Sequence, residues 1–67
     1  MVATPLIFVR VSLVHFDEIS VDLRGHGVRL LYDTPRRGTA DSRINFIHPK
    51  DAGGVLIELV EAGQAIA

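Results

Sequence analysis

The alternation of apolar and polar residues predicts four short strands in this chain of 67 residues. Between Ile7 and Leu13 every second residue is apolar, which is typical of a strand with one face on a core. Three further runs are rich in branched and aromatic side chains and are bounded by glycine, proline or aspartate. We therefore predict strands at 6–13, 28–32, 44–48 and 54–60.

One stretch between the first two strands follows a helical period instead. Phe16, Ile19 and Leu23 are spaced three and four residues apart, which predicts a helix over 16–25 with one apolar stripe. We expect Asp17 to cap this helix, because its carboxylate can accept the unpaired amides of the first turn. Gly25 and Gly27 are expected to end it, since glycine takes the left-handed conformation at low cost.

The order of these elements predicts an α+β fold, in which residues 1–67 form a single β-α-β-β-β module. A four-stranded mixed sheet would carry the helix on one face. The first two strands are expected to be parallel, since the only long crossover passes through the helix. On the last strand, the odd-numbered residues 55 to 59 are expected under the helix. The even-numbered residues 56 to 60 are then expected on the open face.

Size and composition narrow the functional classes. A chain this short builds only a small core, and it has no cysteine for a disulfide or a thiolate metal site. Because 48% of its residues are hydrophobic, part of that surface is expected at a subunit contact. A net charge of −1 gives no field that would attract nucleic acid or an anionic membrane. The apolar run from Pro5 to Val9 is too short to span a bilayer, so a cytoplasmic location is predicted.

Glu58 is the main candidate for chemistry, because it interrupts the otherwise apolar run VLIELV. In an arbitrary strand, such a glutamate is simply exposed to water on the outer face of the sheet. The functional interpretation is a carboxylate that binds a divalent cation on a concave sheet face and takes part in proton transfer. Carboxylates are seldom buried without a partner or a metal, which favours the exposed interpretation for an arbitrary strand.

Two segments carry a family resemblance. GVRLLYDTPRRG at 27–38 and RINFIHPKDAGGVLIEL at 43–59 resemble the C-terminal module of methylmalonyl-CoA epimerases, which belong to the vicinal oxygen chelate superfamily with glyoxalase I and bleomycin-resistance proteins. The resemblance implies an isomerase in which two such modules form a cupped sheet around one divalent cation, Co²⁺, Mn²⁺ or Mg²⁺. The cation would stabilise the enolate of a 2-methylmalonyl thioester while carboxylates remove and return the α-proton. The metal ligand of the closing strand falls on Glu58.

The sequence also departs from the family pattern. The metal-binding histidine of the first strand falls in the region of Ile7 and Phe8, and neither side chain can coordinate a cation. The 67 residues correspond to only one of the two modules, so we expect either a homodimer or a missing N-terminal module to complete the cupped sheet. The alternative is a half-size, non-catalytic module that dimerises or binds a small molecule. Whether this chain is an enzyme is left open by the sequence.

Basic residues beside the loops are candidates for the CoA portion of an acyl-CoA substrate. Lys50 and Arg43 border the last two strands and are expected on the side of the CoA phosphates, since both cations pair well with phosphate. Loop cations of this kind are more often only solvated. His48 precedes Pro49 and either positions the same turn or is a histidine hydrogen-bonded at a strand end.

Overall fold

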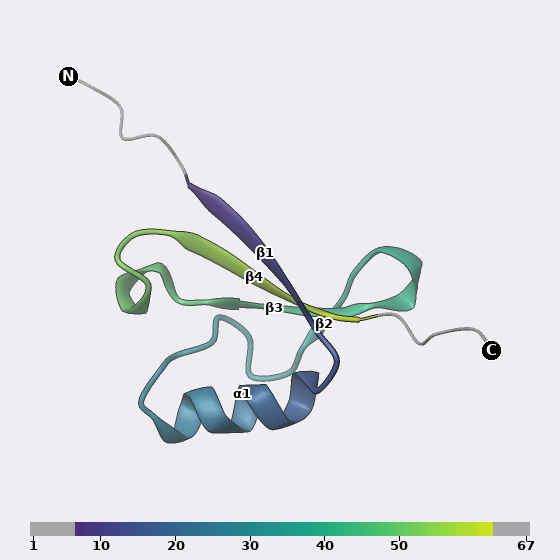
Figure 1. Ribbon diagram of the computed structural model, residues 1–67, viewed down its shortest axis with the longest axis horizontal. Coiled ribbons are helices and arrows are strands. Elements are labelled where there is room, and N and C mark those ends of the chain that lie inside the picture. Colours follow the sequence, from purple (N-terminus) through teal and green to yellow (C-terminus); the bar gives the residue numbers. More distant parts are fainter. Residues whose placement is uncertain (1–6, 63–67) are drawn as a thin grey trace.

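The computed structural model describes residues 7–62 of the chain. Figure 1 shows one helix beside a four-stranded sheet. The elements are β1 (Phe8–Leu13), α1 (Phe16–Gly25), β2 (Arg36–Arg37), β3 (Arg43–Ile47) and β4 (Leu56–Glu61). Two short 3₁₀ turns, η1 (Thr39–Asp41) and η2 (Pro49–Asp51), lie at the two ends of β3.

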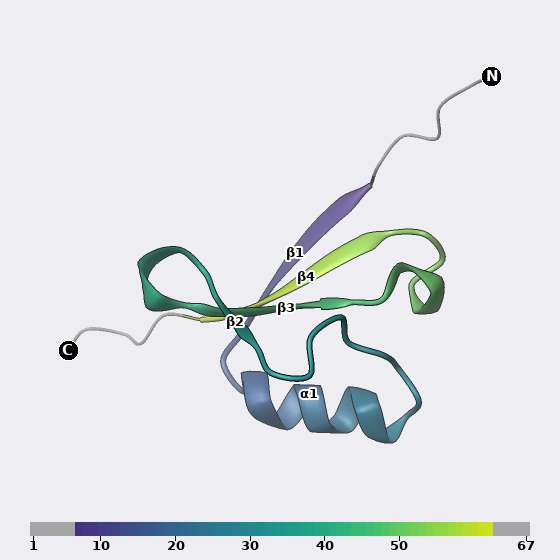
Figure 2. The same cartoon turned by 180° about the vertical axis from the view of Figure 1, so that it is seen from behind.

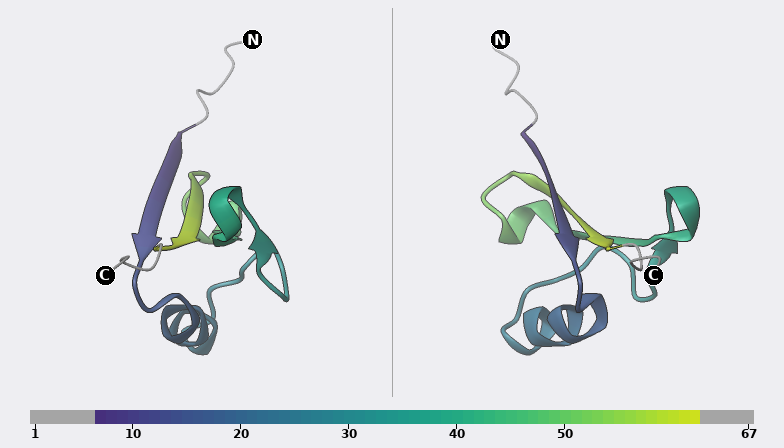
Figure 3. Two further views of the ribbon diagram at one scale, coloured as in Figure 1. Left: turned by 90° about the vertical axis from the view of Figure 1, so that its right-hand side faces the viewer. Right: turned by 45° about the vertical axis from the view of Figure 1, so that its right-hand side comes forward.

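The sheet is mixed, with the strand order β1-β4-β3-β2. β1 runs parallel to β4, while β3 runs antiparallel to both β4 and β2. The helix covers one face of this sheet and the other face is open, as the view from behind and the two side views show (Figures 2 and 3). The predicted α+β fold, with a four-stranded mixed sheet and one helix on one face, is therefore confirmed.

The predicted strand at 28–32 is wrong. This segment forms only a single bridge, between Leu30 and Ile47, and the second strand lies later, at Arg36–Arg37. The buried side chain of Asn45 explains the difference, because its amide forms the hydrogen bonds with Tyr32 that the backbone of a paired strand would otherwise form. The Tyr32 N–H donates to Asn45 Oδ1 at 3.1 Å, and Asn45 Nδ2 donates to the Tyr32 carbonyl at 3.0 Å.

The first two strands run in the same direction, as expected, because β1 is parallel to β4 while β2 and β4 are both antiparallel to β3. They are not neighbours in the sheet, however. β1 instead pairs with β4, in a register that places Phe8 beside Leu56 and Arg10 beside Glu58. Within the described residues the other edge of β1 has no neighbouring strand. Residue 6, where the first strand was predicted to begin, lies outside the described residues.

The helix begins and ends at the predicted residues, but Asp17 does not cap it. The residue at the cap position is His15, whose side chain makes no capping hydrogen bond, while Asp17 binds Arg43 at 2.8 Å. At the other end, Gly27 adopts a φ of +83°. The Val28 N–H then reaches back to the Leu23 carbonyl at 2.9 Å, which closes a Schellman motif.

The core that these elements enclose is small. Among the described apolar side chains, only Phe16 and Leu59 are fully buried, at 1% and 3% exposure. Ile7, Phe8 and Val9 remain 41 to 57% exposed where β1 begins. The described helix is too short and too polar to cross a membrane.

Candidate functional site

Glu58 lies in the middle of β4 on the open face of the sheet. Its register neighbours are Arg10 on β1 and Phe46 on β3, so its carboxylate lies between a cation and an aromatic ring. Leu59, the next residue, points to the opposite face and is buried on the side of α1. Glu58 itself is only 8% exposed. The simple interpretation of a glutamate in open water therefore does not describe it.

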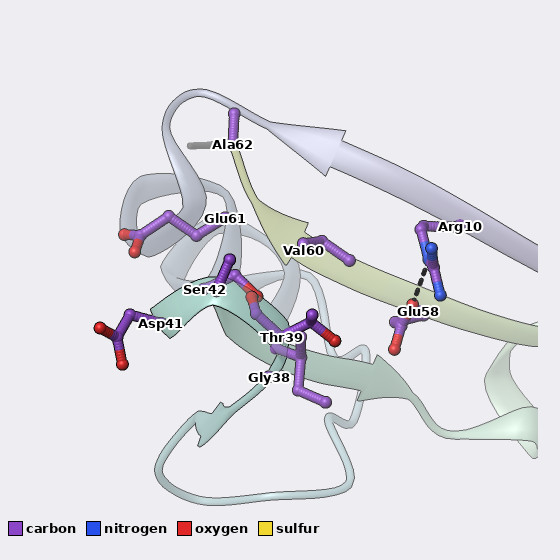
Figure 4. Close-up of a pocket in the computed structure, with 11 residues that line it drawn as sticks. Arg10, Gly38, Thr39, Asp41, Ser42, Glu58, Val60, Glu61 and Ala62 are labelled. Carbon is purple, nitrogen blue, oxygen red and sulfur yellow. Dashed lines mark hydrogen bonds and ion pairs between the residues drawn. The ribbon is translucent and has the colours of Figure 1, made fainter. Parts of the chain in front are cut away.

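Arg10 is the partner that makes this burial possible. Its Nε–H donates to Glu58 Oε1 at 2.6 Å (Figure 4). A hydrogen bond between two charged groups at this distance is among the strong ones, and it satisfies a carboxylate that would otherwise be costly to bury. The sequence did not indicate Arg10, because nothing in the periodicity shows that β1 and β4 are neighbours.

A hollow of about 620 Å³ opens beside this pair, at the end of the sheet where the β2–β3 hairpin turns. Its wall comes from β1, β3, β4 and the hairpin, and Figure 4 shows how these side chains lie. The carboxylates of Asp41 and Glu61 point away from Glu58 in this view. Each has its own cation, since Asp41 lies 3.5 Å from Arg37 and Glu61 lies 2.6 Å from Arg43. Glu58 is therefore the carboxylate that faces Arg10 within the hollow.

The described residues do not fit a divalent cation by themselves. They contain no group of three or more histidine or carboxylate side chains close enough to hold one. Hard divalent cations take six or more oxygen ligands, whereas Glu58 supplies one carboxylate. The guanidinium of Arg10 already lies against that carboxylate. Ile7 and Phe8 sit at the start of the neighbouring strand and offer only hydrocarbon.

The two cations predicted for the CoA phosphates are not brought together. Arg43 begins β3 near the helix, whereas Lys50 lies on η2, beyond the other end of the same strand. Arg43 is engaged by two carboxylates, Asp17 at 2.8 Å and Glu61 at 2.6 Å. Its hydrogen bonds lower the pKa of both acids. Lys50 is exposed and makes no ion pair within the described residues.

The turn that carries Lys50 is held by its neighbours. His48 Nδ1 accepts the Lys50 backbone N–H at 3.2 Å. Asp51 binds Arg29 at 3.0 Å, and the Arg29 guanidinium lowers the pKa of Asp51 to about 2. The structure therefore gives His48 a local hydrogen bond at the strand end, which is one of the two interpretations that the sequence allowed.

Comparison with known proteins identifies relatives of this module. No protein-family profile matches the chain. The mitochondrial methylmalonyl-CoA epimerase of Mus musculus is 40% identical over 52 residues, which cover 73% of this chain and 29% of the mouse protein.

Solved structures agree with that match. The methylmalonyl-CoA epimerase of Mycobacterium tuberculosis superposes with a TM-score of 0.77 at 62% identity, over 82% of this chain and 37% of that protein. A variant of the Streptomyces coelicolor epimerase in complex with 2-nitronate-propionyl-CoA gives a TM-score of 0.75 at 49% identity, over 82% and 39%. The resemblance seen in the sequence is thus confirmed, and the chain spans between a quarter and two fifths of these relatives.

Proposed function

We propose that this chain, which matches methylmalonyl-CoA epimerases over part of their length, supplies one half of an acyl-CoA site and that Glu58 is its functional carboxylate. The observation that carries the proposal is a glutamate that is 8% exposed in the middle of a sheet face that no helix of residues 7–62 covers. Its ion pair with Arg10 accounts for the burial of this charge, and the proposal adds a functional role for the same carboxylate. The module around it is 62% identical to part of an epimerase.

The proposed reaction moves one proton. A base removes the α-proton of a 2-methylmalonyl thioester, and the electron pair of the C–H bond passes to the thioester carbonyl as an enolate. Return of a proton to the other face of the α-carbon restores the thioester with inverted configuration, so no oxidant or co-substrate is needed. In this proposal Glu58 faces the acyl group and acts as the base or acid of one face of the α-carbon.

The resemblance implies a divalent cation, and this chain could bind one only together with a second module. Glu58 is the proposed ligand on this chain, and the remaining ligands would have to come from a second module. No step of the reaction is therefore routed through a metal here. When bound, such a cation would supply stabilisation of negative charge on oxygen.

A second module is also what the exposed start of β1 requires. Ile7, Phe8 and Val9 leave apolar surface beside a strand edge without a partner within the described residues. Edges of this kind pair readily with another strand. A second copy of the chain, or a further module of a longer chain, is the proposed occupant. Together the two open faces would enclose the acyl group, in keeping with the part-length match.

On the phosphate side we assign Lys50 before Arg43. The guanidinium of Arg43 already binds two carboxylates, whereas the ammonium of Lys50 is exposed. A phosphate group would have to compete with Asp17 and Glu61 for Arg43, which disfavours it. The cytoplasmic location predicted from the sequence stays a proposal as well.

One observation favours a second candidate function. The described residues hold no group of three or more metal-binding side chains, the carboxylate of Glu58 is paired with Arg10, and Ile7 and Phe8 offer only hydrocarbon. A half-size module that binds an acyl-CoA or dimerises without turnover would have the same fold.

Proton exchange tests the proposal directly. Methylmalonyl-CoA is incubated with the protein in D₂O, and deuterium at the α-carbon is followed by NMR or mass spectrometry. We expect exchange above the buffer rate and a loss of about 100-fold in the E58Q variant, the size typical of a removed acid–base group. The E18Q variant, which changes an exposed helical glutamate, should exchange like the wild type. Exchange unaffected by E58Q would contradict the role of Glu58, and binding without exchange would favour the second candidate.

A further inference from the structure

Arg10 lies directly against the Glu58 carboxylate, on the β1 side of the site. Glu58 has Phe46 on its β3 side, and a ring carbon offers no lone pair to a metal. On its β1 side, Arg10 Nε lies 2.6 Å from Oε1. The sheet backbone lies beneath the carboxylate, and the hollow above is the remaining space.

The two side chains of this pair differ in exposure. The side chain of Glu58 is 11% exposed and that of Arg10 is 66% exposed. The Glu58 side chain therefore lies within the sheet face, whereas most of the surface of the Arg10 side chain is exposed. The guanidinium carbon of Arg10 also lies 5.9 Å from the centre of the Phe8 ring, which helps to hold it over β1.

The positive charge of this guanidinium disfavours the binding of a metal ion to Glu58. The pair Arg10–Glu58 is neutral, and the other two carboxylates of the hollow are paired with Arg37 and Arg43. A divalent cation entering beside Glu58 would meet a positive charge a few Å away. Unlike a lysine, an arginine cannot release its proton at any working pH, so this repulsion does not disappear on raising the pH.

We propose that Arg10 is the resident cation of the Glu58 site and that it keeps divalent metal ions off this carboxylate in the isolated chain. The inference rests on the proposed function in one respect, the assignment of Glu58 as the functional carboxylate. It assigns Arg10 as the residue that sets the charge of the site. In an assembly of two modules, any metal ion that binds Glu58 would first have to displace Arg10.

Metal titration tests this without any turnover. Mn²⁺ is titrated into the wild type, R10M, R10K and the double variant R10M/E58Q, and bound metal is read by EPR and calorimetry. We expect no Glu58-dependent binding to the wild type or to R10K, which keeps the positive charge. R10M should bind Mn²⁺ on the order of tenfold more tightly or better, as expected when a like charge a few Å away is removed. R10M/E58Q should return to the wild-type level.

Wild-type binding as tight as that of R10M, or a gain in R10M that survives E58Q, would overturn the proposal. Circular dichroism checks that each variant is folded, and R10Q replaces R10M if the latter is not. The wild type also gives a test of its own, because bound Mn²⁺ broadens nearby NMR signals. Selective broadening of the Glu58 and Val60 amides at low Mn²⁺ would refute the exclusion. None of these readouts depends on exchange of methylmalonyl-CoA, so failure of the proposed activity leaves them interpretable.

Discussion

Asn45 shows how much of the architecture depends on one side chain. It is fully buried, and its amide holds the irregular segment before β2 against β3 through two hydrogen bonds with Tyr32. Its oxygen also accepts the Phe46 N–H at 2.8 Å. The residue stands in a strand of ordinary apolar pattern, RINFI, so periodicity treats it as one polar position among apolar ones.

Replacing this amide by a carboxylate should be costly. N45D removes the donor to the Tyr32 carbonyl, places a carboxylate oxygen against that carbonyl, and buries a negative charge at a site with no exposure. We expect the free energy of unfolding to fall by at least ~2 kcal/mol at neutral pH, the penalty for an unsatisfied buried polar group. Urea unfolding measures it. An N45D variant as stable as the wild type would show that Asn45 does not hold this segment.

The β2–β3 hairpin carries a strain that a single substitution can relieve. Ala40 and Asp41 have φ values of +56° and +60°, a region that side chains with a Cβ adopt at a cost. A40G should therefore raise the free energy of unfolding by about 0.5–1 kcal/mol. T39G is the matched control at the preceding residue of the same turn, outside the positive-φ pair, and should destabilise. An A40G variant less stable than the wild type would contradict the expected strain.

Among single residues, the sequence predicted the position of Glu58 better than its surroundings. The period of two places Glu58 on the face away from the helix, and the structure agrees. Arg10 could not be assigned to it, because which strand lies beside β4 depends on packing of the whole sheet. Asp17 was misassigned for a similar reason: a carboxylate near a helix start can cap it or pair with a distant cation, here Arg43.

At the scale of elements, the helix was predictable because its signals are local. Its apolar stripe and its closing glycines all fall within 16–27, and both ends agree with the structure. The second strand was not predictable in this way. The strand-like pattern at 28–32 forms only a single bridge, at Leu30, and the nearby Tyr32 N–H donates to the side chain of Asn45. Two residues of β2, Arg36 and Arg37, are too few to give any periodic pattern.

The two glycines at the end of α1 should respond to alanine in opposite directions. Gly25 is helical, and a methyl group there would meet nothing within 4 Å, so G25A should stabilise by about 0.5–1 kcal/mol. Gly27 has the same open space but a φ of +83°, so G27A should destabilise by about 1 kcal/mol. Thermal unfolding of the two variants is the measurement. Equal shifts of the same sign would show that the Schellman motif does not fix the helix end.

For the molecule as a whole, three paired acids make stability sensitive to low pH. Arg29 lowers the pKa of Asp51 to about 2, and Arg43 lowers the pKa of Asp17 and of Glu61. A carboxyl whose pKa is lower in the folded state binds fewer protons there than in the unfolded chain. Its contribution is therefore complete above the unfolded value near 4 and is lost as the pH falls toward 2.

The urea concentration at the midpoint of unfolding should therefore decrease as the pH is lowered from 4 to 2. D51N should be less stable than the wild type at pH 6, and the difference should shrink toward pH 2 as the wild type loses the same interaction. D33N is the control, because Asp33 makes no ion pair within residues 7–62. A difference between D51N and the wild type that is constant from pH 6 to 2 would argue against the Arg29–Asp51 contribution.

The free edge of β1 bears on the assembly of the molecule. The Ile7 and Leu13 carbonyls accept N–H groups from the β4 side, at 2.9 and 2.8 Å. Backbone groups of a strand alternate in direction, so those of Phe8, Arg10 and Ser12 face the free edge. Beside this edge lie Ile7, Phe8 and Val9, each more than 40% exposed.

Proline at these alternate positions distinguishes pairing at the edge from pairing within the chain. S12P removes an N–H that faces outward, so we expect it to weaken self-association while the bonds from β1 to β4 persist. V11P removes a donor that faces β4 and should instead destabilise the fold itself by about 3 kcal/mol. Sedimentation over a range of concentrations measures association, and circular dichroism measures folding. A wild type that stays monomeric at every concentration would rule out a second copy as the occupant, whereas association unchanged by S12P would place the contact elsewhere on the surface.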